Sequence, residues 1–399
     1  MINPALTLAA LADAALPDAR PTRVEHVTEH PGDHYSLAFI EDNTQRRWAI
    51  RLPTDPVAAA LQDQSLPLLE ALRHHLPYAT PHPHGFASLR DGRRAMLYPL
   101  IPGRTIKFDL LPPGPGLATA LGQAIATIHN LNPTLYDTAG LPTYDATDLH
   151  RRRICDIDLG ASTGLVPTGL LNRWEPLLED IALWRFPTRP THGHLEADHI
   201  LIDFNDPHDA STGHIVAITS WDNATIGDPA TDLATVLTHT NRRAAEAIFT
   251  AYTTTLTEPP DPSIRRRATL LSELRLLGKL LTAKRLNNHH ALTHATQALT
   301  HLNEQVGNQP IPHEPFNPTP TPPTPHTPIT DLYSAGTPTT DIAFHTENTP
   351  TPSAEERAYT TKTTPHRTTQ RHPKDTTRPG GGTQSAANRS HNTLTNTTP

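Results

Sequence analysis

The amino-acid sequence predicts an α+β protein made of a small antiparallel sheet, a larger helical part and a disordered tail. Two pairs of short apolar segments lie within the first 100 residues, and a polar turn joins the members of each pair. Longer segments with apolar side chains at helical spacing follow from about residue 116. Beyond Gly307 the composition shifts to Pro, Thr, His, Ser and Asn. We therefore divide the chain into residues 1–100, 101–306 and 307–399.

The first part is predicted to be one sheet with a helix packed on it. An initial helix over residues 1–16 starts near Asn3-Pro4, since proline is favoured in the first helical turn. Residues 57–75 have helical spacing, with Pro67 as an irregularity. The strand pairs are Tyr35–Glu41 with Arg47–Leu52, and Phe86–Ser88 with Ala95–Tyr98.

The second part is predicted to be mostly helical. Two short strands, residues 200–203 and 214–218, lie among the helices next to polar loops, which a rigid scaffold can hold in place. The predicted helices cover residues 116–131, 148–157, 170–184, 231–255, 263–286 and 291–306.

Composition narrows the possible partners and the cellular compartment. A net charge of −7 argues against a broad nucleic-acid or membrane-surface role. A single cysteine, Cys155, rules out a disulfide framework or a cysteine zinc site, and we expect a plain buried or half-buried thiol. The N-terminus lacks a basic region that would mark a secretory signal, and no segment has the apolar length of a membrane span. We expect a cytoplasmic protein with no nucleic-acid or membrane partner.

The tail, residues 307–399, is rich in Pro, Thr and polar residues. Too few aliphatic side chains remain there to offset the entropy of ordering the backbone, so we expect disorder. Such a composition is compatible with binding a protein partner, which the sequence does not identify.

Five motifs together carry a family resemblance. They are W-A-I-R-L-P (48–53), L-Y-P-L-I-P-G-R (97–104), I-H-N-L (128–131), H-G-x-L-x-x-x-H-I-L-I-D (192–203) and W-x-x-A-x-x-G-D-P-x-x-D-L-A (221–234). In this order and spacing the chain resembles the aminoglycoside phosphotransferase family, and especially its macrolide 2′-phosphotransferase-like actinobacterial branch. The resemblance covers roughly residues 20–305. It implies a protein-kinase-like two-lobed fold, with ATP or GTP between the lobes and a hydroxylated small molecule as acceptor.

The resemblance also assigns the catalytic loop. Its His and Gly match His192 and Gly193, and the next position, where the family has an Asp that orients the acceptor hydroxyl, is His194. The family's metal-placing Asn, which is often His in macrolide-type members, corresponds to His199. His192 and His194 are thus the catalytic candidates. An imidazole can serve as a base near neutral pH, although it can also be cationic.

The family's Mg²⁺-binding I-D-W motif reads Thr219-Ser220-Trp221 here. A serine supplies an oxygen ligand but no charge, whereas Mg²⁺ prefers charged oxygens. Asp222 is two residues further on, and alternation along an extended chain could place it on the same side to bind the metal through a water. Asp228 and Asp232 match the G-D-P-x-x-D element. They are expected to brace the loop, with Asp232 bonding the backbone amides around His192–His194.

The nucleotide-binding side of the predicted site also lacks several residues that the family uses. The phosphate-covering loop contains one glycine, Gly32, and Arg51 stands where the family has a phosphate-pairing Lys. Arginine can pair phosphate oxygens bidentately. The helix expected to offer that cation a Glu presents Gln64 or Ser65, and Glu70 is more than a turn away. Arg51 is therefore either unpaired or paired with a residue that the sequence does not reveal.

Backbone groups of the segment from Tyr98 to Leu100 are expected to face the adenine. The acceptor is expected among helices such as residues 160–174 and 244–257. Because both acidic positions are replaced, our hypothesis is a phosphotransferase-like protein with weak or absent phosphoryl transfer. The alternative is an active ATP- or GTP-dependent enzyme that uses Mg²⁺, with His194 as an unusual base for a macrolide or aminoglycoside hydroxyl.

Overall fold

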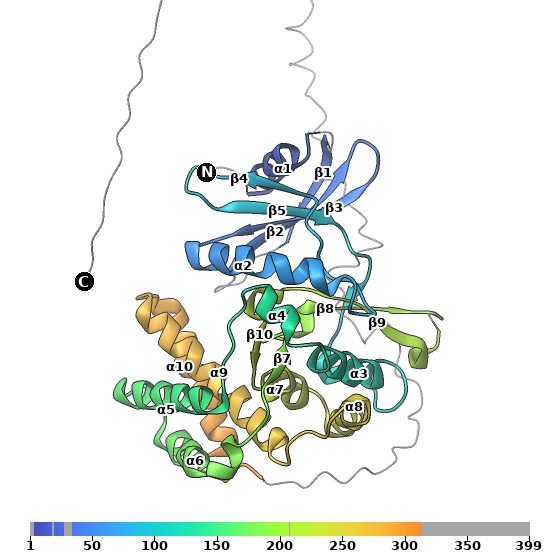
Figure 1. The fold of residues 1–399 in the computed structure, drawn as a ribbon. Coiled ribbons are helices and arrows are strands. Elements are labelled where there is room, and N and C mark those ends of the chain that lie inside the picture. Colours follow the sequence, from blue (N-terminus) through green and yellow to red (C-terminus); the bar gives the residue numbers. More distant parts are fainter. Residues whose placement is uncertain (1–3, 18–19, 28–33, 207, 313–399) are drawn as a thin grey trace, which may run out of the picture. The chain divides into compact units, whose positions relative to one another are not determined.

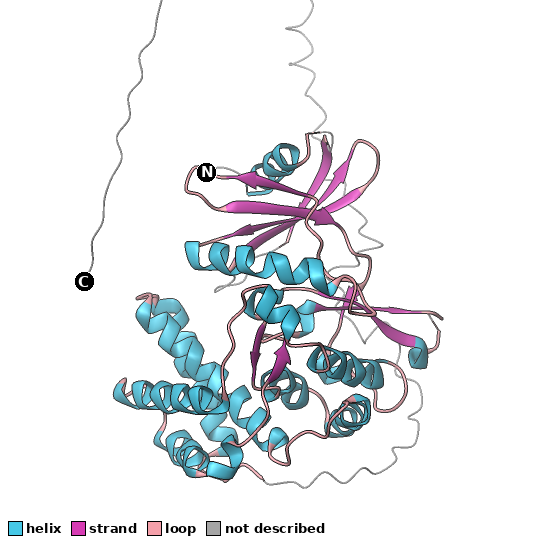
Figure 2. Cartoon of the chain, in the orientation of Figure 1, coloured by secondary structure: helices cyan, strands magenta, loops and turns pink. Residues whose placement is uncertain are grey.

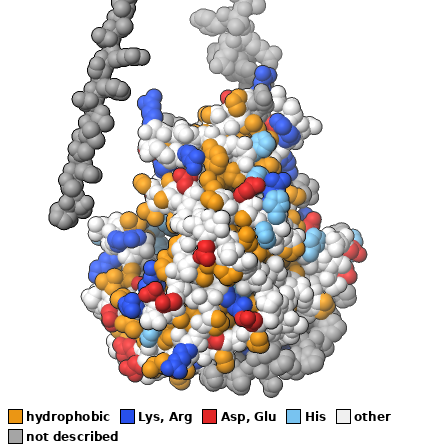
Figure 3. Space-filling model, in the orientation of Figure 1, with side chains coloured by type: hydrophobic (Ala, Val, Ile, Leu, Met, Phe, Trp, Pro, Cys, Tyr) orange, Lys and Arg blue, Asp and Glu red, His pale blue; other side chains and the backbone are white. Residues whose placement is uncertain are grey.

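The computed structural model describes residues 4–17, 20–27, 34–206 and 208–312. Within them, strands gather in a sheet built from the first hundred residues, and helices dominate the remainder (Figures 1 and 2). The predicted α+β class with two lobes is confirmed. Acidic and basic side chains are interspersed over the face drawn in Figure 3.

The N-terminal lobe is a five-stranded antiparallel sheet with the order β1-β2-β3-β5-β4. The helix α1 packs on one face, where its Leu8 and Ala12 join a core cluster with Ile40, Ile50 and Leu97. The helix α2 is capped by Asp55, whose carboxylate accepts hydrogen bonds from two N–H groups of the first turn. The elements are α1 (Pro4–Ala15), β1 (Pro21–His26), β2 (Tyr35–Asp42), β3 (Arg47–Pro53), α2 (Pro56–Leu72), β4 (Gly85–Ser88) and β5 (Arg94–Pro99).

The C-terminal lobe consists of helices and a few short strands. The strands β6 (Arg104–Thr105), β8 (Ile200–Phe204) and β9 (Gly213–Ile218) form one sheet, and β7 (Arg189–Thr191) pairs with β10 (Thr225–Gly227). In Figure 1, α3 and α8 lie on one side, while α5, α6 and α10 lie on the other. The helices are α3 (Leu117–His129), α4 (Thr134–Thr138), α5 (Ala146–Ser162), α6 (Thr168–Glu179), α7 (Ala230–His239), α8 (Arg242–Thr255), α9 (Ile264–Arg285) and α10 (His289–Val306).

Two predicted helices are in fact interrupted. The segment 231–255 forms both α7 and α8, because the Asn241 side chain accepts the Ala244 N–H and starts a new helix. The segment 170–184 ends as α6 at Glu179, and Asp180 then caps a short 3₁₀ turn. Polar capping residues inside an apolar pattern were the signal for both breaks.

Two further expectations were wrong in detail. The folded part continues past Gly307, since Ile311 is buried in the core cluster of α6, α9 and α10, and the Gln309 carbonyl accepts a hydrogen bond from Arg173. The remainder of the predicted tail, residues 313–399, lies outside the described residues. Cys155 is exposed rather than buried, because α5 turns its Ile157 and Gly160 face toward the core. Among the described residues, no helix is both long and apolar enough to cross a membrane.

Candidate functional site

The loop between β7 and β8 is held in place by one buried carboxylate. Asp232, at the start of α7, accepts the backbone N–H groups of His192 at 2.7 Å and Gly193 at 2.8 Å. Its Oδ2 also lies 3.2 Å from Nε2 of His129 on α3. Burial favours the neutral acid, but the hydrogen bond and charge of His129 outweigh it and lower the pKa of Asp232. Asp232 therefore fixes the backbone of the catalytic-type loop.

Gly193 allows this loop to pass close to the next functional segment. Its φ of +81° lies in the left-handed region, and a Cβ there would come within 1.9 Å of the Asn223 carbonyl oxygen. A side chain at this position would therefore require both a strained backbone and a shift of the neighbouring segment. The two sequence motifs meet at this glycine.

His192 is buried and positions the loop. Its Nε2 donates a hydrogen bond to the Thr219 carbonyl oxygen at 2.7 Å, which ties the loop to the segment that carries Ser220. Burial lowers its pKa to about 4, so the ring is neutral at pH 7. With no exposed surface, His192 does not meet a substrate, and we treat it as a positioning residue.

His194, at the family's Asp position, is about half exposed, but the Arg275 guanidinium contacts its Nε2. Its Nε2 lies 2.9 Å from Nη2 of Arg275 on α9, and 3.4 Å from Oε1 of Glu196. A guanidinium can only donate, so the Arg275 contact requires Nε2 to accept. That lone pair is then not available to take a hydroxyl proton.

Arg275 was not among the predicted site residues. Its guanidinium also contacts Glu196 and the Thr235 hydroxyl. Burial works against ionisation of Glu196, yet the neighbouring His194 and Arg275 lower its pKa to about 2. The sequence signal for it is the row of basic side chains alongside the leucines of residues 263–286, a pattern that is also typical of an ordinary amphipathic helix.

His199 is held in a tautomer that suits metal binding. Its Nδ1 donates to the His194 carbonyl oxygen at 2.8 Å, which leaves the lone pair on Nε2. Burial lowers its pKa and favours the neutral ring. The nearest acid to Nε2 is Asp198 at 3.7 Å, whose side chain is 78% exposed.

Ser220 lies where the backbone turns sharply. Its φ of +63° and ψ of +50° are left-handed, a conformation in which Asp and Asn are enriched among residues with side chains. The following residues, Trp221–Asn223, form a 3₁₀ turn instead of an extended strand. The alternation that would have placed Asp222 beside Ser220 is therefore absent.

Asp222 instead pairs with Arg51 of β3 across the two lobes. Arg51 donates from Nη1 to Oδ1 at 2.9 Å and from Nη2 to Oδ2 at 2.5 Å, with the two side chains 12% and 5% exposed. The guanidinium also stacks on Tyr35, with its carbon 3.2 Å from the ring centroid. Burial would raise the pKa of Asp222, but the charge and hydrogen bonds of Arg51 lower it. This bidentate pair supplies the partner of Arg51 that the sequence did not reveal.

The helix α2 makes no contact of this kind. Gln64 donates to the Gly140 carbonyl oxygen, and the Ser65 hydroxyl donates to the Gln62 carbonyl oxygen. Glu70 faces His82, with the two side chains 3.1 Å apart. The family's strand-to-helix ion pair is thus replaced by a strand-to-loop pair.

Tyr98 and Leu100, at the ends of the segment expected to face the adenine, contact the N-terminal sheet. Tyr98 is buried in a small apolar cluster with Phe39, Ala49 and Met96. The Leu100 N–H donates to the Arg47 carbonyl oxygen at 3.0 Å and continues the sheet. Gly32, the predicted phosphate-loop glycine, lies outside the described residues.

The donor groups present do not suit Mg²⁺. Ser220 offers a neutral hydroxyl, both oxygens of Asp222 are bonded to Arg51, and His199 offers nitrogen. Mg²⁺ prefers an octahedron of hard, charged oxygens. Over the described ranges, no group of three or more His, Cys, Asp or Glu side chains could hold a metal ion.

Asp228 anchors the loop after β10 to α9. Its carboxylate accepts two hydrogen bonds from Arg267, at 2.8 and 3.0 Å, and one from the Ala230 N–H. Arg267 is completely buried and also pairs with Asp261 at 2.8 Å. Asp228 and Asp232 thus form two buried polar anchors for the same region.

A cavity of about 710 Å³ opens next to His194. It lies between α5, α7 and α9, and its wall includes Gly193, His194 and Arg275. No residue of 160–174 or 244–257 lines it, so those segments do not form this wall. Helices α5 and α9 supply most of its lining instead.

The two-lobed fold is shared with proteins of known structure. The model of the phosphotransferase enzyme family (APH) matches residues 26–267, well over half of the chain. The chain belongs to this family. Macrolide 2′-phosphotransferase MphH from Brachybacterium faecium has a similar structure, with 24% identity and a TM-score of 0.61 over 74% of this chain and 97% of that chain.

An aminoglycoside phosphotransferase of the family, solved with GDP and kanamycin, is 18% identical, with a TM-score of 0.62 over 75% of this chain and 99% of that chain. Among curated sequences, the uncharacterized protein YcbJ of Bacillus subtilis (strain 168) is 26% identical over 215 residues. That alignment covers 50% of this chain and 66% of YcbJ, so the chain spans just under two thirds of this relative.

Proposed function

We propose that this phosphotransferase-family protein binds a hydroxylated small molecule and transfers phosphate weakly or not at all. The observation that carries the proposal is the buried Arg51–Asp222 pair. The cation expected to hold nucleotide phosphates and the nearest carboxylate of the metal-binding segment neutralise each other there. The cation that a phosphotransferase directs at ATP is thereby bound to the carboxylate that could have replaced the missing metal-binding Asp.

The catalytic loop supports the same conclusion. The acidic position is His194, whose Nε2 accepts from Arg275, and the metal position is the uncharged Ser220. General-base catalysis needs a free acceptor within reach of the substrate hydroxyl, and phosphoryl transfer needs charge neutralisation by metal ions. Neither requirement is met by these side chains as they stand.

Nucleotide binding tests the proposal. Calorimetry with ATP and GTP, with and without Mg²⁺, should give little or no binding by the wild type that depends on the metal. The His194→Asp/Ser220→Asp variant should gain Mg²⁺-dependent binding, because both acidic groups return on an unchanged loop. Metal-dependent binding by the wild type, together with turnover of any acceptor, would refute the proposal.

An active ATP- or GTP-dependent phosphotransferase that uses Mg²⁺ is the second candidate. It is favoured by the 45% exposure of the His194 side chain, which lies at the wall of the cavity, and by the free Nε2 of His199. In that case His194 would act as base once substrate displaced Arg275. A bell-shaped pH profile of turnover that disappears in His194→Gln would support this candidate.

A further inference from the structure

The cavity beside His194 has a strongly cationic wall. Its lining includes the basic side chains Arg153, Arg275, Lys279, Lys284 and Arg285, and one acid, Asp156. The chain as a whole carries a net charge of −7, so this concentration of cations is a local departure from the average surface. Clustered charge of one sign raises the local concentration of ligands of the opposite sign.

Two of these cations are neutralised and three are available to a ligand. Arg153 pairs with Asp156 at 2.9 Å, and Arg275 pairs with Glu196. Within the described part of the chain, Lys279, Lys284 and Arg285 form no ion pair. All three are exposed. Lys284 and Arg285 lie in the last turn of α9, where basic residues also interact favourably with the helix dipole.

The same wall offers apolar surface. Leu271, Leu274 and Leu281 line it from α9, and Leu159 lines it from α5 with 57% of its surface exposed. Gly278 lies in the middle of this face, and a Cβ there would meet nothing within 4 Å. A glycine in a helix interior costs about 1 kcal/mol relative to alanine. No packing contact in the described structure requires it, so its effect is to widen the cavity.

We propose that this cavity binds an anionic amphipathic small molecule, with a hydroxyl at His194, an apolar body along the leucines and an acidic group at Lys279 to Arg285. The proposal rests on the proposed function, since it assigns a ligand class to the same site. With about 1.5 Å of rise per residue, these cations lie roughly 6 to 15 Å along α9 from Arg275. The ligand is therefore elongated, with its hydroxyl and its anion at opposite ends.

Cationic ligands fit this wall poorly. Kanamycin, which the similar aminoglycoside phosphotransferase holds in its complex, is a polyamine whose ammonium groups would face like charges here. Juxtaposed like charges are a common means of excluding a wrong partner. The cavity wall thus selects against the aminoglycoside charge type.

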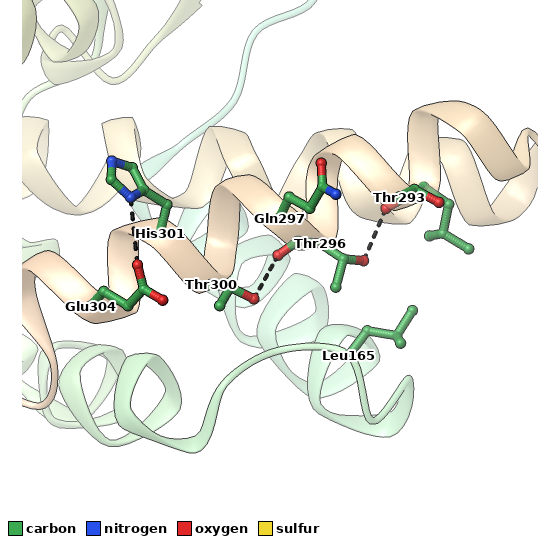
Figure 4. A pocket seen from close by; sticks show the side chains of 8 residues that line it. Leu165, Thr293, Thr296, Gln297, Thr300, His301 and Glu304 are labelled. Atoms are coloured by element: carbon green, nitrogen blue, oxygen red, sulfur yellow. Dashed lines mark hydrogen bonds and ion pairs between the residues drawn. The ribbon is translucent and has the colours of Figure 1, made fainter.

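A second hollow lies between α10 and Leu165 of the segment that joins α5 to α6 (Figure 4), and it offers less to a ligand. Its threonine hydroxyls donate to carbonyl oxygens one turn earlier in the helix, as Thr296 does to Leu292 and Thr300 does to Thr296. His301 and Glu304 face one another at 3.6 Å on the exposed surface. Its threonine hydroxyls are therefore bonded within the helix and its lining, within the described residues, has no cluster of cations, so the cavity beside His194 is the better binding site.

A matched series of probes tests the charge preference without nucleotide or turnover. Calorimetry should be run on the full chain with 12-hydroxydodecanoate, its neutral methyl ester and 12-amino-1-dodecanol, which share a chain length and a terminal hydroxyl. We expect the carboxylate to bind at least tenfold more tightly than the amine, with the ester between them. Equal affinities, tighter binding of the amine or no binding of the carboxylate would overturn the proposal. Because nucleotide is absent, the outcome does not depend on the phosphoryl-transfer result.

Variants locate the binding. Lys279→Glu/Arg285→Glu should weaken carboxylate binding at least tenfold, whereas Arg73→Glu/Arg90→Glu, the same charge change on exposed cations outside the cavity lining, should not. Gly278→Leu should abolish binding while the melting temperature is unchanged or higher, because a Cβ at this position meets no neighbour and leucine is a better helix former than glycine. Binding that survives Gly278→Leu, or that both charge reversals weaken equally, would place the ligand elsewhere and contradict the proposal.

Discussion

The residues that anchor the catalytic-type loop differ from the residues at its reactive positions in their burial and in how their charges are used. Asp228 and Asp232 are buried and fully bonded, and they hold the loop through Arg267 and through the backbone of His192 and Gly193. At the reactive positions the side chain is either uncharged or already bonded to an arginine. Ser220 is neutral, Asp222 is paired with Arg51, and His194 accepts from Arg275.

This contrast indicates that the fold and the chemistry are separable in this chain. The anchors stabilise the loop whether or not phosphate is transferred, because a buried carboxylate without its partners would destabilise the protein. His194 and Ser220 are partly exposed, so their replacement costs little stability, whereas Asp222 is buried and paired. A protein can therefore keep the loop geometry as a binding framework while transfer activity declines.

The largest effect is expected at the Arg267 anchor. Arg267→Met would leave Asp228 and Asp261 buried without their cation, and we expect a loss of about 3–5 kcal/mol in the free energy of unfolding. Urea denaturation measures it. The matched control is Arg265→Met, whose pair with Glu246 is 20% and 29% exposed and should contribute no more than about 1 kcal/mol. Similar losses in both variants would remove the distinction between anchors and surface.

A pH titration of stability tests the burial of His192. The folded pKa of about 4 lies below the unfolded value near 6.5, so the unfolded chain binds more protons between these values. Stability due to this residue is therefore complete above about pH 6.5 and is lost as the pH falls toward 4, by up to about 3 kcal/mol. The slope should flatten in His192→Gln, which can still donate to Thr219. An unchanged slope would show that His192 is not buried in neutral form.

The inter-lobe pair should have an intermediate effect. Asp222→Asn removes the charge opposite Arg51, and we expect a loss of about 1–3 kcal/mol at pH 7, read from chemical denaturation. The folded pKa of Asp222 is depressed, so this contribution is present above the unfolded value near 3.9 and fades as the pH falls through the folded pKa. Asp198→Asn, on an exposed side chain, is the control and should be neutral.

The smallest effect is expected at Ser220. Ser220→Asp should change the free energy of unfolding by no more than about 0.5 kcal/mol, because aspartate tolerates the left-handed backbone. Ser220→Val should cost more than about 1 kcal/mol, since a β-branched side chain does not. Thermal unfolding of the two variants compares them. A severe loss in Ser220→Asp would mean that the reactive position is also structural.

Sequence patterns located most of the fold but little of the charge pairing. Long helices such as α3 and α9 carry enough periodicity to be recognised, whereas β7 and β10 have three residues each and show no pattern. The positions of His194 and Ser220 followed from motif spacing. The pair between Arg51 and Asp222 joins residues 171 apart in sequence, and no local pattern can reveal such a contact. The left-handed turn at Ser220 escaped prediction for a related reason, since the surrounding fold imposes it.

The ratio of ATP affinities with and without Mg²⁺ tests the central claim most directly. The claim is that the charges which would hold a metal-bound nucleotide are absent or paired with one another. The account predicts a ratio near one for the wild type and a ratio above ten for His194→Asp/Ser220→Asp. A wild-type ratio above ten would contradict it, because the present side chains would then bind the metal with its nucleotide.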